Sequence, residues 1–125
     1  MLRGRRDDEP VDMNERSPQL GLRYKDLAVI DQLVKNDADL SESRHVIYYL
    51  FAPNQETAQA MRGEAETSGY EASVREPLPK FPRQWAVICE TRAVTSPDFV
   101  READELFQGI ADRHAADYDG WEASV

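Results

Sequence analysis

The longest apolar run in the sequence is Val46-Ile47-Tyr48-Tyr49-Leu50-Phe51-Ala52. It falls far short of the ~20 apolar residues that a membrane-spanning helix needs. β-Branched and aromatic residues dominate it, so residues 44–51 are predicted to form a strand that ends before Pro53. Because successive side chains of a strand point to opposite faces, both faces of this strand are apolar. The run therefore predicts a central strand of a sheet that is covered on both sides.

Apolar spacing divides the rest of the chain into helices and strands. Apolar residues at helical spacing predict helices over residues 25–36, 55–68 and about 95–116. Strand-like composition predicts further strands at residues 70–75 and 84–92 and a short last strand at 121–125, after a turn at Asp119-Gly120. The expected capping and stop signals of the helices are Asn54, Gly69, Thr95 or Ser96, and Pro97.

This order of elements, a helix followed by βαββαβ, predicts an α+β fold of the ferredoxin-like kind. Its antiparallel sheet carries two helices on one face, with the first and third strands at the centre. We expect residues 21–125 to form this one domain and residues 1–20 to be a flexible polar arm. The face that the two helices leave open needs a cover. The N-terminal helix is the preferred cover, and a second copy of the chain or a partner protein are the alternatives.

The chain is acidic, with a formal net charge of −9. This charge repels phosphate backbones and argues against direct nucleic-acid binding, whereas it favours basic partners. Tyr49, Phe51 and Trp85 lie in strands that can stack RNA bases in folds of this topology, but residues 84–90 contain no basic side chain. Solubility alone is an equally good reason for an acidic surface.

The N-terminal residues and the cysteine content both bear on the cellular location of the protein. The N-terminus turns acidic at Asp7, Asp8 and Glu9, where a signal peptide would turn apolar. The single cysteine, Cys89, cannot form a disulfide within the chain. We therefore expect a cytoplasmic protein without a membrane anchor.

No group of residues has the spacing of a catalytic or cofactor site. Cys89 lies in an apolar strand and is expected to be buried as a small hydrophobic residue. His45 begins a strand, and His114 continues the apolar stripe of the last helix. A metal site of His114, Asp117 and Asp119 matches no ligand pattern. We therefore predict that the chain is not an enzyme and needs no cofactor or metal.

The segment from Asp98 to Glu122 concentrates negative charge. It contains eight acidic and two basic residues, a local charge of −6. Such a surface can bind an arginine- or lysine-rich segment of another protein, although a solvated helix flank explains it equally well. The candidate partner-binding residues are Glu102, Glu105, Asp112, Asp117, Asp119 and Glu122.

The segment Tyr118-Asp119-Gly120-Trp121-Glu122 resembles the C-terminal signature of the RraB family of ribonuclease E inhibitors. The resemblance covers about residues 23–125. Its other landmarks, in order, are the strand Arg44–Phe51, Ala58, Gly69-Tyr70, Trp85-Ala86-Val87, Leu106 and Ala111. In physical terms, Trp121 can fold back as an apolar anchor whose N–H needs an acceptor. We therefore expect the signature residues to be structural rather than partner contacts.

The resemblance implies a small acidic cytoplasmic protein with a ferredoxin-like α+β fold. It also implies a non-enzymatic regulator, monomeric or homodimeric, that binds ribonuclease E, including the non-catalytic scaffold region of that enzyme. Enterobacterial members carry an acidic tail after the signature, whereas here three residues follow Glu122. A different target protein therefore stays open. A small-ligand-sensing or dimerisation domain of the same fold is the alternative function.

Overall fold

Three helices and four strands follow one another in a computed structural model that describes residues 12–125. They are α1 (Tyr24–Lys35), β1 (Ser43–Ala52), α2 (Gln55–Thr67), β2 (Glu71–Arg75), β3 (Trp85–Val94), α3 (Pro97–Arg113) and β4 (Asp117–Ala123). The predicted order, a helix followed by βαββαβ, is confirmed. No helix within these residues is long and apolar enough to cross a membrane.

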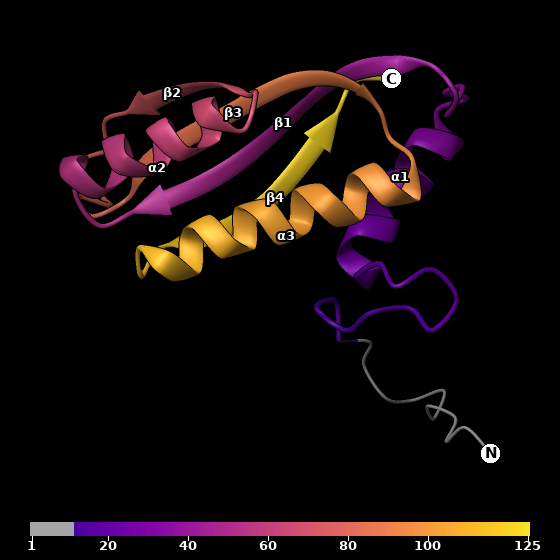
Figure 1. The fold of residues 1–125 in the computed structure, drawn as a ribbon, viewed down its shortest axis with the longest axis horizontal. Helices are drawn as coiled ribbons and strands as arrows, with labels where there is room; N and C mark the ends of the chain where they lie inside the picture. The colour runs from indigo at the N-terminus through magenta and orange to yellow at the C-terminus, as the bar shows by residue number, and fades with distance from the viewer. Residues whose placement is uncertain (1–11) are drawn as a thin grey trace.

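The four strands form one antiparallel sheet in the order β2-β3-β1-β4 (Figure 1). The first and third strands of the chain are therefore central, as predicted. Tyr48 lies opposite Cys89, and Leu50 lies opposite Val87, so the inward-facing residues of β1 and β3 meet on one face. This arrangement confirms the α+β ferredoxin-like fold.

Local capping chemistry sets the limits of α2 and α3. The Asn54 side chain accepts a hydrogen bond of 2.8 Å from the backbone N–H of Thr57. Ser96 does the same for the N–H of Phe99 at 3.1 Å, with Pro97 in the first turn of the helix. After α2, Gly69 has a φ of 95°, a left-handed conformation that glycine adopts without strain. These caps and this stop match the sequence prediction.

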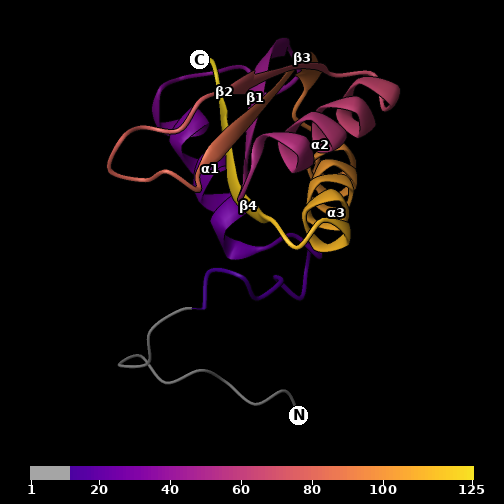
Figure 2. The ribbon, with the colours of Figure 1, turned by 90° about the vertical axis from the view of Figure 1, so that its left-hand side faces the viewer.

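The hydrophobic core lies between one face of the sheet and the helices α2 and α3, which Figure 2 shows together on one side of the sheet. Along β1, buried residues alternate with half-buried ones, as expected for a strand with two different faces. Tyr48 stacks on Phe107 of α3 with ring centroids 4.4 Å apart. Met61 of α2 and Leu50 of β1 are also fully buried.

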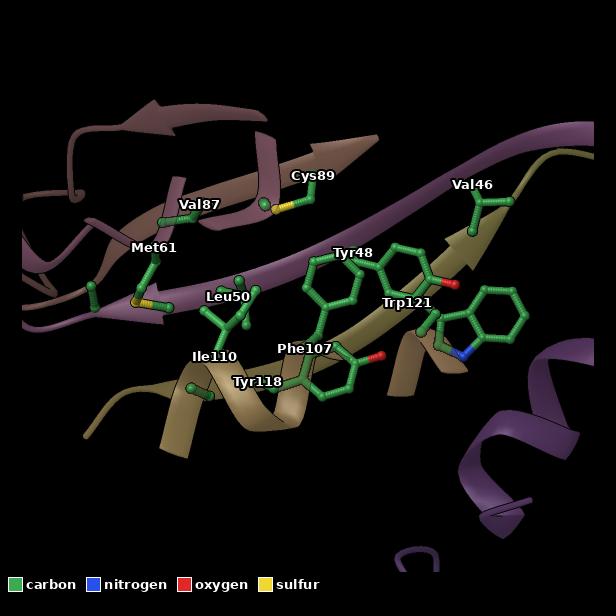
Figure 3. Packing of buried hydrophobic residues seen from close by; sticks show 14 of the residues in the cluster. Val46, Tyr48, Leu50, Met61, Val87, Cys89, Phe107, Ile110, Tyr118 and Trp121 are labelled. Carbon is green, nitrogen blue, oxygen red and sulfur yellow. The ribbon is translucent and has the colours of Figure 1, made fainter. Parts of the chain in front are cut away.

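Helix α1 lies beside β4 on the face that α2 and α3 also cover. Trp121 of β4 is opposite Tyr48 in the sheet, so both side chains point to the core face. The indole of Trp121 reaches Asp26 of α1, and Figure 3 shows the indigo helix on the side to which Trp121 and Tyr118 project. The prediction that the N-terminal helix covers the second face is therefore wrong, because α1 extends the first helical layer at the β4 edge.

The chain turns from α3 into β4 earlier than predicted. Helix α3 ends at Arg113, and Ala115 has a φ of 50°, which places the turn at residues 114–116. Asp119-Gly120 is instead a bulge within β4, because Tyr49 lies opposite Gly120 and Leu50 lies opposite Tyr118. Gly120 has a φ of 122°. The turn expected at Asp119-Gly120 is thus a kink inside the last strand.

The segment just before α1 packs against α3. Ser17 is buried and Leu22 is fully buried. Arg101 of α3 donates a hydrogen bond of 3.0 Å to the backbone carbonyl of Leu20. These contacts place part of residues 16–22 against α3. Residues 1–11 of the predicted arm lie outside the described part of the chain, and the flexibility of the arm stays a prediction.

Candidate functional site

The six candidate partner-binding residues lie on two different surfaces. Glu102, Glu105 and Asp112 are exposed at helical spacing along α3. Glu122 of β4 lies opposite Ile47, whose neighbours Val46 and Tyr48 point into the core, so the Glu122 side chain is on the face away from α3. Asp117, opposite Phe51, shares that face. Asp119 is exposed at the bulge. Residues close together in the sequence are thus divided by the sheet.

The acidic side chains also differ in how they are held. Asp112 accepts a hydrogen bond of 3.0 Å from Gln108, one turn earlier on α3. Glu122 accepts a hydrogen bond of 2.6 Å from the hydroxyl of Tyr49, and this bond raises the pKa of Tyr49 to about 12. Glu102 and Glu105 have no ion-pair partner among residues 12–125 and remain available to a partner's cations.

Tyr118 and Trp121 of the C-terminal signature are anchored in the core. Trp121 is 8% exposed, and its ring stacks near Tyr48 at a centroid distance of 6.0 Å. Its Nε1–H donates a buried hydrogen bond of 2.9 Å to Asp26 Oδ1. Tyr118 packs against Phe107 and lies 5.1 Å from the Lys25 ammonium. The apolar anchor with a satisfied N–H, expected for Trp121, is present.

Two buried carboxylates join the N-terminal segment to this anchor. Asp104 of α3 is 1% exposed and accepts hydrogen bonds from Arg16 at 2.9 Å and from Arg23 at 3.0 Å. Asp26 is equally buried. Within the described residues, four buried oxygens of this region lack a hydrogen-bond partner from the protein: Asp26 Oδ2, Asp104 Oδ1, Tyr48 OH and Tyr118 OH. The region is thus a polar cluster inside the fold.

Burial raises the pKa of Asp26 above its ordinary value, although the hydrogen bond from Trp121 acts in the opposite direction, and the negative charge of Asp104 adds to the rise. A carboxyl whose folded pKa is raised stabilises the fold below its unfolded pKa, near 3.8, and this contribution is lost as pH rises through the folded pKa. Ionisation of Asp26 therefore costs stability as pH rises through the folded pKa.

We expect Asp26→Asn to raise the melting temperature at pH 7. Asparagine does not ionise, and its Oδ1 can still accept the Trp121 hydrogen bond. The gain is expected to shrink as pH falls toward 3.8, where the parent carboxyl is also neutral. Thermal unfolding of both proteins across this pH range measures the difference. A variant less stable than the parent at pH 7 would show that the carboxylate charge itself is needed.

A family model described as regulator of ribonuclease activity B, or RraB, matches residues 24–123. The chain belongs to the RraB family. This match confirms the resemblance drawn from the C-terminal signature, and it spans all seven helices and strands. A comparison with curated proteins gave no match. The family is one of regulators of ribonuclease activity, which implies a ribonuclease as the protein partner.

The other reactive side chains of this RraB-family chain are held in structural contacts. Cys89 is fully buried in β3, and burial raises the pKa of its thiol to about 12, so the thiol stays protonated. His45 Nε2 lies 3.0 Å from Glu90 on the neighbouring strand. His114 contacts Glu64 of α2. Among residues 12–125, no group of histidine, cysteine and acidic side chains has the geometry to hold a metal ion.

Glu64 links α2 to the end of α3 and gives the RraB-family fold a pH-dependent contact. It accepts hydrogen bonds of 3.1 and 2.7 Å from Arg113, besides the contact with His114. Burial alone would raise the pKa of Glu64, but these hydrogen bonds outweigh it and lower the pKa. The contact therefore stabilises the fold above the unfolded pKa, near 4.5, and is lost as pH falls through the folded pKa.

Glu64→Gln is expected to lower stability at pH 7 by less than about 1 kcal/mol, because this contact is at the surface. The difference from the parent should vanish near pH 3. Glu66→Gln is the matched control, since the one ion pair of Glu66 within residues 12–125 is with Arg62 of its own helix, at 3.1 Å. Melting curves of the parent and both variants at pH 7 and pH 3 measure these differences in stability. A Glu64→Gln deficit that persists unchanged in acid would rule out the ionic contact as its cause.

Sequence reasoning missed the polar cluster around Asp26 and Asp104. Each aspartate stands on the apolar side of its helix: Asp26 precedes Ile30 by four residues and Leu33 by seven, and Asp104 precedes Phe107 by three. An acidic residue inside an apolar stripe needs a buried partner. An aspartate within an apolar stripe could therefore have indicated a buried polar contact. The sequence alone does not identify Trp121 or the two arginines as the partners.

Proposed function

We propose that this chain is a non-enzymatic, cytoplasmic regulator that binds ribonuclease E and inhibits or modulates its activity. The observation that carries this proposal is the RraB family match over residues 24–123. Two side chains of types that often act in catalysis are held in the fold, which supports a non-enzymatic role. Cys89 is buried as a thiol, and His114 contacts Glu64. Binding requires no cofactor.

Electrostatic attraction is the proposed basis of recognition. The chain carries a net charge of −9, and acidic side chains project from α3 and from β4. The scaffold region of ribonuclease E, as the family resemblance implies, offers basic segments to such surfaces. Complementary charge speeds encounter and selects partners. The candidate contacts are Glu102, Glu105, Asp112, Asp117, Asp119 and Glu122.

A pull-down with the chain as bait, from a lysate of its source organism, tests the partner. Exposed charge pairs are screened over about 10 Å at 0.1 M salt. We therefore expect ribonuclease E to be retained at low salt and released at high salt. A pull-down at low salt that lacks ribonuclease E would show that the target is a different protein.

One surface hollow favours the alternative function, ligand sensing. It lies between α1 and β4, measures about 240 Å³, and is lined mainly by Val29, Leu33, Trp121 and Ala123. Ligand sites usually have about 300–1,000 Å³, so this hollow would take only a small apolar molecule. Thermal stabilisation by a ligand from a small-molecule library would favour this alternative.

A further inference from the structure

The side of the sheet that faces away from the helices carries a strip of apolar side chains. We call it the open face and define it by Ile47, Tyr49 and Phe51 of β1 with Ala86 and Ile88 of β3, which share one side of the sheet by register. All five are half-buried and lie outside the core cluster of the described residues. Apolar strips of this kind mark interaction sites.

A row of carboxylates crosses the open face beside this strip. Glu71 of β2 lies opposite Glu90 of β3, Glu90 lies opposite Ile47, and Ile47 lies opposite Glu122 of β4. Like charges directly opposite each other in a sheet are destabilising. Glu71 has no ion-pair partner within residues 12–125. Glu90 is contacted by His45 at 3.0 Å and Glu122 by the Tyr49 hydroxyl, so Glu71 is the carboxylate of the row that a cation from outside would pair first.

The positive charges of the open face lie at its two ends. Arg92 is opposite His45 at one end, and Arg75 is opposite Ala86 at the other. The carboxylate row and the neighbouring pair of Tyr49 and Ile88 lie between them. A binding segment therefore meets acid and apolar surface together at the centre of the face.

We propose that the open face is the docking surface for a cationic segment of a partner protein. Arginine or lysine side chains of that segment pair with Glu71, Glu90 and Glu122, and an apolar side chain packs on Tyr49 and Ile88. The ring of Tyr49 also offers a cation–π contact to arginine. This inference rests on the proposed function in one respect, namely that the cationic segment belongs to a ribonuclease.

Charge selects this occupant over the two others that a sheet face can take. A symmetric dimer centred on the carboxylate row would bring two such rows together. Single-stranded RNA would bring phosphates to the same row. A cationic peptide is the occupant that neutralises it.

Nuclear magnetic resonance of the ¹⁵N-labelled chain tests the surface without any ribonuclease. The probe is a synthetic peptide of alternating arginine and leucine, and the matched probe has glutamate in place of arginine. We expect the arginine peptide alone to shift the amide signals of Ile47, Tyr49 and Ile88. Shifts confined to α3, or none on the open face, would overturn the proposal. Shifts there with a single-stranded RNA and not with the peptide would also overturn it.

Two double variants remove the same charge from different surfaces. Glu71→Gln with Glu90→Gln should weaken arginine-peptide binding about tenfold, whereas Glu56→Gln with Glu66→Gln, two exposed positions on α2, should change it less than about twofold. The first pair should melt close to the parent, because relief of the like-charge contact between Glu71 and Glu90 offsets the loss of the exposed His45–Glu90 contact. Equal affinity for both double variants would overturn the proposal.

The same proteins are then tested against purified full-length ribonuclease E of the same organism. Failure of the parent chain to bind the enzyme, with the peptide still on the open face, would reject the proposed function and keep the docking surface. Enzyme binding that is unchanged in the open-face variant would reject the docking surface alone.

Discussion

Replacing Trp121 with alanine is expected to lower the free energy of unfolding by about 3–5 kcal/mol, the usual cost of deleting a buried tryptophan. The side chain is 8% exposed and packs against Tyr48. The substitution would also leave Asp26 without its hydrogen bond from the indole, and an unsatisfied buried acceptor adds to the cost. Chemical denaturation of parent and variant measures the difference.

A second variant of Trp121 separates the contribution of its ring from that of its N–H donor, and a variant of an exposed ring serves as the control. Trp121→Phe keeps an aromatic ring but removes the Nε1–H donor, so its loss of stability should lie between the parent and the alanine variant. Phe81→Ala, in the loop between β2 and β3, removes a ring that is 51% exposed and should change stability little. A Trp121→Ala variant that melts like the parent but loses its partner would make this residue a contact and not an anchor.

Asp104→Asn should have the second largest effect, a loss of about 2–3 kcal/mol. Removing one member of a buried ion pair typically costs about 3–5 kcal/mol, because the remaining charges lose their partner. Arg16 and Arg23 keep 39% and 18% of their side chains exposed, so water offsets part of the loss. The substitution should also loosen residues 16–23, which amide hydrogen exchange detects.

Asp98→Asn is the matched control on the same helix. Asp98 is 82% exposed and pairs with Arg101 at 2.8 Å. An exposed pair of this kind contributes less than about 1 kcal/mol. If the two aspartate variants lost equal stability, or if Asp104→Asn left hydrogen exchange at residues 16–23 unchanged, the ion pairs of Asp104 would not hold the N-terminal segment.

The order of elements and the positions of the central strands were predictable because local patterns determine them. The apolar run at residues 46–52 has the composition of a central strand, and Asn54 and Ser96 satisfy backbone N–H groups within three residues of themselves. Such signals need no knowledge of distant parts of the chain.

The placement of α1 was not predictable in this way. It depends on contacts between residues far apart in the sequence, above all Asp26 with Trp121 and Arg23 with Asp104. An apolar stripe shows that a helix packs on something, but it does not say on which face of a sheet. The prediction therefore assigned α1 to the wrong side, and the open face was left without its expected cover.

The candidate acidic surface shows the same limit. Charge density along residues 98–122 was visible in the sequence, but it could not show that Asp104 is buried or that Glu122 points away from α3. The bulge at Asp119 alters the alternation of β4, so the faces of its residues follow only from the register. Proximity in sequence was a poor guide to a shared surface.

Cleavage of a short fluorogenic RNA by purified ribonuclease E, with increasing amounts of the chain, is the most direct test of the regulatory role. The assay compares the full-length enzyme with its catalytic half, which separates binding at the scaffold region from binding at the catalytic region. We expect the rate for the full-length enzyme to fall and then level off as the chain saturates its site. A rate that stays constant for both enzyme forms, at an excess of folded chain, would contradict the regulation of ribonuclease E by this protein.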